Sequence, residues 1–258
     1  MSVAIADLLT AALAREIAAA GLRVFAVTSP ASVAAALAAR ELGAGDLALT
    51  AGFTALDGSP SPSLTGGEAA LLGRGPAFRD EPGDIFLALT RGWVGVVATP
   101  AQLDARGRTN LSGIGMPGAP KVALPGSRGL PDHCSPSSIW YLFAQHGPRQ
   151  LVERVDVVSG AVPPVGALRR LLTPAGCFEL GEDGWRARWL TAGGSELLGA
   201  TPGLGVEVSG AEPVHDARDA DALAALERVD PYGVRRVEFA AGDEALRLWA
   251  QAAAREAA

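Results

Sequence analysis

The clearest chemistry in the chain lies in a glycine- and proline-rich loop at residues 125–136, which contains Arg128. Arg128 stands between Ser127 and Gly129, and Gly126 precedes them. Glycine lets a backbone approach a ligand closely, and amides exposed in such a loop can hold a developing oxyanion. A guanidinium in this place could clamp a carboxylate with two hydrogen bonds or polarise a ketone. The loop is therefore the first candidate site.

Arg128 and Ser127 each also fit a structural role. Arg128 could be an exposed arginine that pairs with Asp132, and the Ser127 hydroxyl could cap the turn instead of bonding a substrate. No Ser-His-Asp arrangement accompanies Ser127. On the residues alone, both alternatives stay open.

The histidines and cysteines form neither a metal pattern nor a disulfide framework. The three histidines and two cysteines are His133, His146, His215, Cys134 and Cys177. His133 and Cys134 adjoin the glycine loop, but neighbouring side chains usually point apart and no third group orients them. We expect no metal site and do not favour a Cys/His catalytic pair.

Residues 113–118 read GIGMPG and match the G-x-G-x-x-G pattern of dinucleotide-binding loops. That motif must open a helix, and Pro117 and Pro120 would break it. No acidic residue follows at the distance of the ribose-binding acid. We therefore reject a nucleotide cofactor at this position.

Composition excludes several classes of protein. The chain has 258 residues, 48% of them hydrophobic, and a net charge of −6, so a sizeable core is possible and a basic face for nucleic acid is not indicated. Lys121 is the only lysine and stands beside a proline, which disfavours Schiff-base chemistry. No signal-peptide pattern and no apolar run of about 18 residues is present, so we expect a soluble, cytoplasmic protein without a membrane span.

The order of the predicted elements gives the fold class. Helices are predicted at residues 2–20, 31–42, 220–229 and 243–257, and strands at 22–27, 46–50, 94–99, 139–144, 154–158 and 203–208. Ser29 is the expected N-cap of the second helix, with Pro30 at the first helical position. The alternation of Trp140, Tyr141 and Phe143 predicts core residues on one buried face. A hairpin is predicted from 168–173 and 177–180, extended by 185–190. The β–α–β order at the start predicts an α/β fold with an open, mostly parallel sheet flanked by helices. We expect one domain over residues 1–258, with an antiparallel extension in its second half.

Three sequence blocks carry a family resemblance. They read AQLDARGRTN at residues 101–110, LPGSRG at 124–129 and QLVERVDVVSG at 150–160, with weaker matches at 177–180 and 229–231. In this order and spacing they resemble the second, β, subunit of class I CoA-transferases of the glutaconate CoA-transferase type. The resemblance implies a CoA-transferase/NagB-RpiA-like fold, an acyl-CoA substrate and an α-subunit partner in an α2β2 assembly. It implies no cofactor besides the coenzyme A of the substrate.

The same resemblance implies a glutamate nucleophile in the turn after the strand at residues 46–50. Here the turn reads Thr50-Ala51-Gly52. Neither Thr50 nor Ala51 offers a carboxylate, so a glutamyl thioester cannot form there. Glu68 is the nearest acid downstream, and we do not favour it as a relocated nucleophile because it lies in an irregular loop.

A glutamate-less sub-branch of the family resembles the chain more closely. It comprises the β subunits of the CoA hydrolase that opens the last steroid rings in bacterial cholesterol breakdown, and it shares the Leu-Thr-x-Gly turn, the loop arginine and the VDVVSG ending. The resemblance implies that Arg128 acts at the active site with a glutamate from the partner subunit. We also predict a catalytic role for Ser127, whose hydroxyl could contribute a hydrogen bond beside it. The resemblance also implies a substrate- or CoA-binding set of Thr50, Ala51, Gly52, Gln102, Asn110, Gly126 and Gly129. Gln102 and Asn110 fit turn hydrogen bonds equally well.

We therefore predict hydrolytic carbon–carbon cleavage of a cyclic keto acyl-CoA, as in steroid degradation, by a complex with an α subunit. An acyl-CoA decarboxylase or a true CoA-transferase is one alternative, although the family's decarboxylases carry a cysteine in the early turn. A non-catalytic subunit that completes the partner's pocket is the other.

Overall fold

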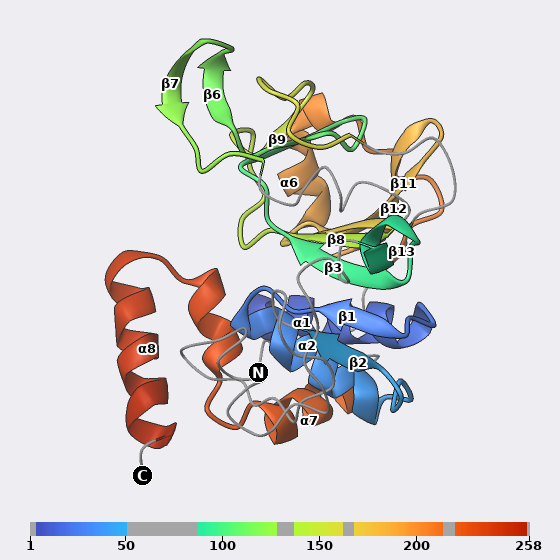
Figure 1. Cartoon of the computed structure of the whole chain (residues 1–258), viewed down its shortest axis with the longest axis vertical. Coiled ribbons are helices and arrows are strands. Elements are labelled where there is room, and N and C mark those ends of the chain that lie inside the picture. Colours follow the sequence, from blue (N-terminus) through green and yellow to red (C-terminus); the bar gives the residue numbers. More distant parts are fainter. Residues whose placement is uncertain (1–3, 51–86, 128–136, 162–167, 214–219, 257–258) are drawn as a thin grey trace. The chain divides into compact units, whose positions relative to one another are not determined.

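The computed structural model describes residues 4–50, 87–127, 137–161, 168–213 and 220–256 (Figure 1). The described residues form two compact units, and each is considered by itself. The first unit comprises Met1–Leu87, Trp93–Val97 and His215–Ala258, and the second comprises Ala88–Gly92 and Ala98–Val214. The expectation of one domain over residues 1–258 stays a prediction.

Three parallel strands form the sheet of the first unit, in the order β2-β1-β3. The strands are β1 (Val24–Ala26), β2 (Ala48–Thr50) and β3 (Val94–Ala98). The helices are α1 (Ile5–Ala19), α2 (Pro30–Glu41), α7 (Ala220–Val229), the 3-10 helix η3 (Val234–Phe239) and α8 (Gly242–Glu256). Figure 1 shows α1 and α2 next to β1 and β2, as a β–α–β unit requires.

Small residues let the helices of the first unit pack closely. Most of α1 is buried, including Leu9 and Leu13, and α2 buries a row of alanines. Alanine has no side-chain entropy to lose and leaves room for the neighbouring backbone. The alanine-rich composition is therefore part of the core of this unit.

Helix α2 begins where the sequence predicts it. Ser29 has an extended backbone, its hydroxyl accepts a hydrogen bond from Ser32 N at 3.3 Å, and Ser32 Oγ accepts from Ser29 N at 2.9 Å. Pro30 occupies the first helical position, where its missing N–H is no loss. This capping box fixes the chain at the carboxyl end of β1.

The second unit is richer in strands. Its strands are β4 (Gln102–Asp104), β5 (Thr109–Asn110), β6 (Gly113–Met116), β7 (Ala119–Ala123), β8 (Ser138–Leu142), β9 (Leu151–Val152), β10 (Arg169–Thr173), β11 (Gly176–Gly181), β12 (Gly184–Leu190) and β13 (Glu212–Pro213). Its helices are α6 (Gly194–Gly199) and the 3-10 helix η1 (Pro202–Leu204). The order β8-β10-β11-β12-β13 has parallel pairs at both ends and an antiparallel meander in the middle. Two smaller sheets, β5-β4-β9 and β6-β7, complete it.

The aromatic residues around β8 are core, as their pattern predicts. Trp140, Tyr141 and Phe143 are all fully or almost fully buried. Tyr141 meets Trp185 of β12 edge to face, with ring centroids 6.3 Å apart. Because Trp140 and Tyr141 are consecutive strand residues that point to opposite sides, β8 is buried on both faces, whereas the alternation predicts burial on one face alone.

The fold class is confirmed: the sheet is mixed, mostly parallel and flanked by helices, with the antiparallel extension in the second half. Two predicted strands are wrong. Residues 203–208 begin in the 3-10 helix η1, and residues 154–158 lie beyond the end of β9. In the latter, the amides of Val155 and Asp156 bond to the side chains of Asp104 and Gln102 and so do not join a strand ladder.

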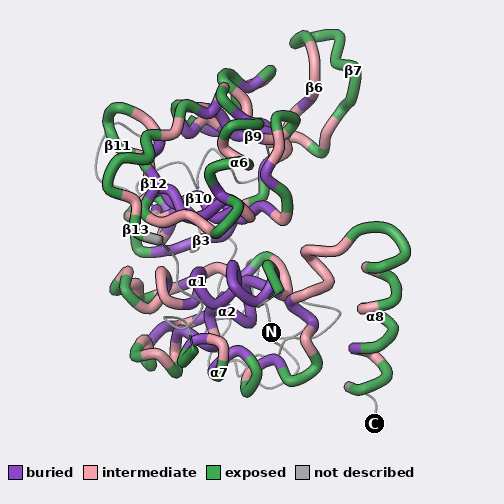
Figure 2. The backbone as a smooth tube through the Cα atoms, turned by 180° about the vertical axis from the view of Figure 1, so that it is seen from behind, coloured by how far each residue is buried: buried purple, intermediate pink, exposed green. Residues whose placement is uncertain are grey.

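Residues 113–118 form the β6-β7 hairpin, which supports the rejection of a dinucleotide loop. Figure 2 shows exposed residues along this hairpin and along much of α8. Every residue of β7 is exposed, and so is Met116 at the tip. The two cores lie elsewhere, in the strands and helices described above.

Candidate functional site

The structure brings together the three sequence blocks that carry the resemblance. The block at residues 101–110 forms β4 and β5, and β4 pairs with β9 of the block at 150–160. The loop at 124–127 joins them, because Gly126 N donates to Leu111 O at 3.0 Å. Residues nearly 60 positions apart in the sequence therefore form one cluster in the second unit.

A pair of buried amides holds this cluster. Asn110 Nδ2 donates to Gln102 Oε1 at 2.7 Å and to Gly113 O at 2.8 Å. Gln102 Oε1 also accepts from Asp156 N at 3.0 Å, and Gln102 Nε2 donates to Asp156 Oδ2 at 3.3 Å. Because most donors and acceptors of both amides are used inside the protein, the arrangement favours a positioning role for Gln102 and Asn110. Contact with CoA stays a prediction for them.

Ser159 links the same cluster to the glycine loop. Its Oγ accepts from Leu111 N at 2.8 Å and lies 2.7 Å from Ser112 Oγ. Leu124 N in turn donates to Ser112 O at 3.2 Å. The chain thus enters the loop at a position fixed by the residues that follow β5 and by Ser159.

The described part of the glycine loop ends at Ser127. Ser127 is half-buried, and Gly126 has φ +99°, a conformation that favours glycine. Arg128 and Gly129 lie outside the described residues, as do His133 and Cys134. The roles of Arg128 and Ser127 therefore stay predictions.

Thr50 lies in the first unit, and its match to the nucleophile turn of the family stays a prediction from the resemblance. It is the last residue of β2, is 2% exposed, and its carbonyl accepts from Val27 N at 2.8 Å. Ala51 and Gly52 follow it and lie outside the described residues, as does Glu68. The strand end is where open α/β sheets bind ligands.

Sequence reasoning missed the acids that organise the cluster. Asp104 is fully buried, and its carboxylate accepts from Arg106 N, Arg108 N and Arg108 Nε at 2.7–3.0 Å. Asp156 accepts from Gly115 N at 2.8 Å as well as from Gln102. A glycine-containing turn follows Asp104, whereas no such signal marks Asp156.

The described residues hold no group of three or more His, Cys, Asp or Glu that could bind a metal ion. No helix in the described ranges is long and apolar enough to cross a membrane. His146 lies in a loop and is buried between two threonines.

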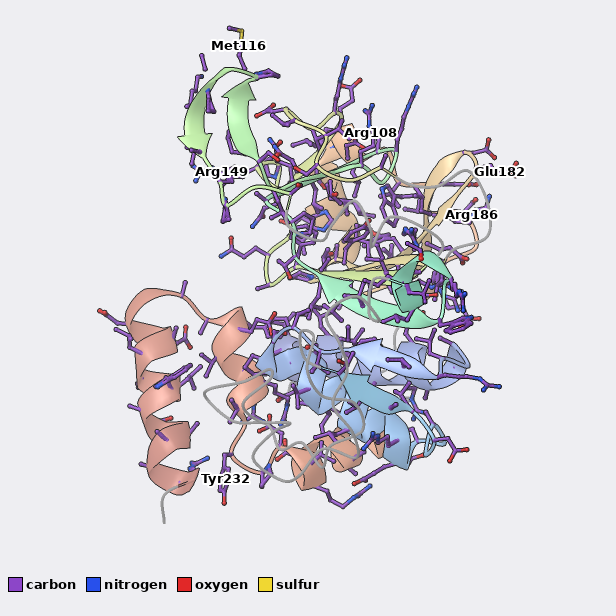
Figure 3. The ribbon with its side chains drawn as sticks, in the orientation of Figure 1. Arg108, Met116, Arg149, Glu182, Arg186 and Tyr232 are labelled. Atoms are coloured by element: carbon purple, nitrogen blue, oxygen red, sulfur yellow. The ribbon has the colours of Figure 1, made fainter. Side chains whose placement is uncertain are left out.

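A hollow of about 430 Å³ follows the β11-β12 hairpin. Glu182 and Arg186, two of its lining residues, are labelled in Figure 3. The arginines of the hollow are already matched by acids: Arg186 Nε lies 3.1 Å from Glu207, and Arg188 lies 3.3 Å from Glu179. Glu182 and Asp183 add further negative charge to its wall. The hollow therefore offers no excess positive charge to an acyl-CoA.

Three solved structures place the fold among known proteins. The decarboxylase AibA/AibB is 28% identical over 91% of this chain and 98% of its own, with a TM-score of 0.78. IpdAB from Rhodococcus jostii RHA1 is 22% identical over 93% and 100%, with a TM-score of 0.75. Glutaconate coenzyme A-transferase from Acidaminococcus fermentans is 17% identical over 93% and 99%, with a TM-score of 0.76. No family model and no curated protein matches the sequence.

These neighbours confirm the resemblance to CoA-transferase-family subunits and the fold that it implies. Fold, clustered sequence blocks and neighbours together define the chain as one with the architecture of a CoA-transferase-family subunit.

Proposed function

We propose that the chain is the β subunit of a heteromeric enzyme of the CoA-transferase family. In our proposal it acts on an acyl-CoA and cleaves a carbon–carbon bond by hydrolysis, together with an α subunit in an α2β2 assembly in the cytoplasm. The observation that carries the proposal is the sequence at the end of β2 and directly after it. In a fold of this family, the chain has Thr50-Ala51-Gly52 where a transferase has its glutamate. Neighbours such as AibA/AibB, named as two components, support a partner subunit.

The proposed reaction opens the ring of a cyclic β-keto acyl-CoA. Water, deprotonated by a carboxylate of the α subunit, adds to the ring ketone. The bond between that carbon and the α carbon of the thioester then breaks, which leaves a carboxylate and a thioester enolate, and the α carbon takes up a proton. Arg128 would stabilise the enolate or anchor a carboxylate, with Ser127 and Gly129 beside it and Gly126 as the turn that lets the backbone approach the substrate. No cofactor beyond the substrate's own CoA is needed.

Replacing Arg128 tests its role. Arg128→Ala should lower kcat by roughly 100- to 1000-fold, the loss typical of a group that stabilises developing negative charge. Assembly with the α subunit, followed by size-exclusion chromatography, should be unchanged. Arg149→Ala, which removes an exposed arginine of the same unit, is the control. An Arg128→Ala enzyme with full activity contradicts the role, and loss of assembly on substitutions across residues 125–131 instead favours the non-catalytic subunit.

Decarboxylation is the second candidate, because the neighbour with 28% identity is a decarboxylase. Turnover in ¹⁸O-labelled water separates the reactions. Hydrolytic cleavage puts ¹⁸O into a new product carboxylate and conserves carbon, whereas decarboxylation releases CO₂. A true transferase would instead be inactivated by hydroxylamine or borohydride in the presence of acyl-CoA.

A further inference from the structure

A basic hollow of about 470 Å³ lies beside the turn between β4 and β5 in the second unit. Its lining residues are Ala105, Arg106, Arg108, Glu153 and Arg154. Three arginines and one glutamate thus line the hollow, in a chain whose net charge is −6. Figure 3 shows Arg108 well apart from Arg149 and Arg186 of the same unit. A local excess of positive charge on an acidic protein attracts anions to that place.

The strand register brings the arginines together. In the parallel pair of β4 and β9, Asp104 lies opposite Val152. Arg106 and Arg154 each follow two residues later, so they leave neighbouring strands side by side. Gly107, with φ +73°, turns the chain back and places Arg108 on the same hairpin.

The buried carboxylate of Asp104 fixes the backbone around the hollow. Its Oδ1 accepts from Arg106 N at 2.9 Å and from Arg108 N at 3.0 Å. Its Oδ2 accepts from Val155 N, next to Arg154, at 3.3 Å. One fully buried acid therefore holds the backbone beside all three arginines, which is the preorganisation that a binding site needs.

Two of the three guanidinium groups remain available. Arg108 Nε donates to Asp104 Oδ2 at 2.7 Å, which holds that side chain at the edge of the hollow. Arg106 and Arg154 are exposed, and within the described part of the chain neither side chain has a hydrogen bond or an ion pair. In the β11-β12 hollow, by contrast, Arg186 and Arg188 are paired with glutamates.

We infer that this hollow binds a phosphate group of the nucleotide end of coenzyme A, with Arg106 and Arg154 as the ligands and Arg108 at its edge. The inference rests on the proposed acyl-CoA substrate and assigns the place of its phosphates. Guanidinium groups match phosphate oxygens in two-pronged hydrogen bonds, and a phosphate with more than one negative charge requires more than one cation. Glu153 also lines the hollow, and its negative charge disfavours the binding of a partner with a larger anionic surface.

Calorimetric titration of the complex of the full chain with its α subunit tests the inference. The probes are CoA, 3′-dephospho-CoA and pantetheine, which lacks the whole nucleotide. Arg106→Ala and Arg154→Ala should each weaken CoA binding by about tenfold, the loss of one charge-assisted contact to phosphate. Pantetheine binding should not change. The control, Arg149→Ala, removes one positive charge elsewhere in the same unit.

Each result has one meaning. If the arginine variants lose affinity for CoA but not for dephospho-CoA, the hollow binds the 3′-phosphate; if they lose both, it binds the diphosphate. If the Arg106→Ala and Arg154→Ala variants bind CoA as tightly as the Arg149→Ala control does, the inference is overturned. It is also overturned if the two variants lose as much affinity for pantetheine as for CoA. Both results leave the proposed function intact. If the complex of the parent chain with its α subunit binds no CoA, both the inference and the proposed function are overturned. Unfolding midpoints of the variants, equal to that of the parent, exclude misfolding.

Discussion

His146 shows how a single buried residue is held by its hydrogen bonds. Its Nδ1 lies 2.8 Å from Thr173 Oγ1, and its Nε2 lies 2.6 Å from Thr201 Oγ1. Thr173 Oγ1 accepts from Ala175 N, and Thr201 Oγ1 donates to Leu197 O. These bonds are all satisfied when the ring is neutral and carries its proton on Nε2. Desolvation by burial lowers the pKa of His146 from 6.5 to about 4.

The lowered pKa predicts a pH dependence of stability. The unfolded chain binds a proton at His146 below about pH 6.5 and the folded chain only below about pH 4, so stability is complete above 6.5 and is lost as pH falls toward 4. The loss amounts to ~3 kcal/mol at most. Urea unfolding of His146→Gln and the parent, from pH 7 to 4.5, checks this. Because glutamine does not titrate there, the variant should lose less stability, and parallel curves would contradict the assignment.

At the scale of elements, the start of α2 is held by hydrogen bonds from neighbouring residues and from the C-terminal part of the chain. Ser29 and Ser32 bond reciprocally, and Ser32 Oγ also accepts from Thr28 N at 2.8 Å. Glu238 of η3 accepts from Ala31 N at 3.3 Å, so the C-terminal part of the chain secures the same turn. Burial raises the pKa of Glu238, while hydrogen bonds from Ser29 and Ala31 oppose the shift.

The N-cap at Ser29 should make a measurable contribution to the free energy of unfolding. Ser29→Ala should lower the free energy of unfolding by about 1 kcal/mol, the usual loss when a helix N-cap is removed. Ser29→Thr keeps the hydroxyl and should retain most of it. Chemical denaturation monitored by far-UV circular dichroism gives both values. A variant series in which alanine and threonine behave alike would show that the cap contributes little.

At the scale of the whole chain, the first unit is closed by its two ends. Arg235 is fully buried and bonds Asp7 of α1 at 2.9 Å and Asp230 at 3.0 Å. Arg236 also reaches Asp7, and Glu227 of α7 pairs with both arginines. Asp7 and Arg235 lie 228 positions apart, so this ion cluster can form only when the N-terminal and C-terminal segments pack together.

Breaking this cluster should cost far more than breaking a surface pair. Asp7→Ala leaves a buried guanidinium short of a partner and should destabilise the protein by about 2–4 kcal/mol. The matched control is Glu41→Ala, which removes the exposed pair with Arg228 and should cost less than about 1 kcal/mol. If urea unfolding gives equal losses of stability for Asp7→Ala and Glu41→Ala, the ion cluster does not stabilise the fold more than a surface pair does.

The sequence by itself determined the local features of this protein. Three of these features depend only on neighbours within a few residues: the spacing of hydrophobic residues, the helix start at Ser29-Pro30 and the aromatic residues around β8. They could therefore be predicted directly from the sequence. The absence of an acid at residues 50–52 is likewise a property of the sequence alone, and the main functional proposal follows from it.

Only the tertiary structure decided how distant residues meet. Gln102, Asn110 and Asp156 look like separate turn residues in the sequence, and their amide network depends on the register of β4 against β9. The same register unites Arg106 with Arg154, 48 positions later, and diverts residues 154–158 from the predicted strand. A pairing between strands is fixed by the packing of the whole unit, because a shift of one residue would turn every side chain to the other face.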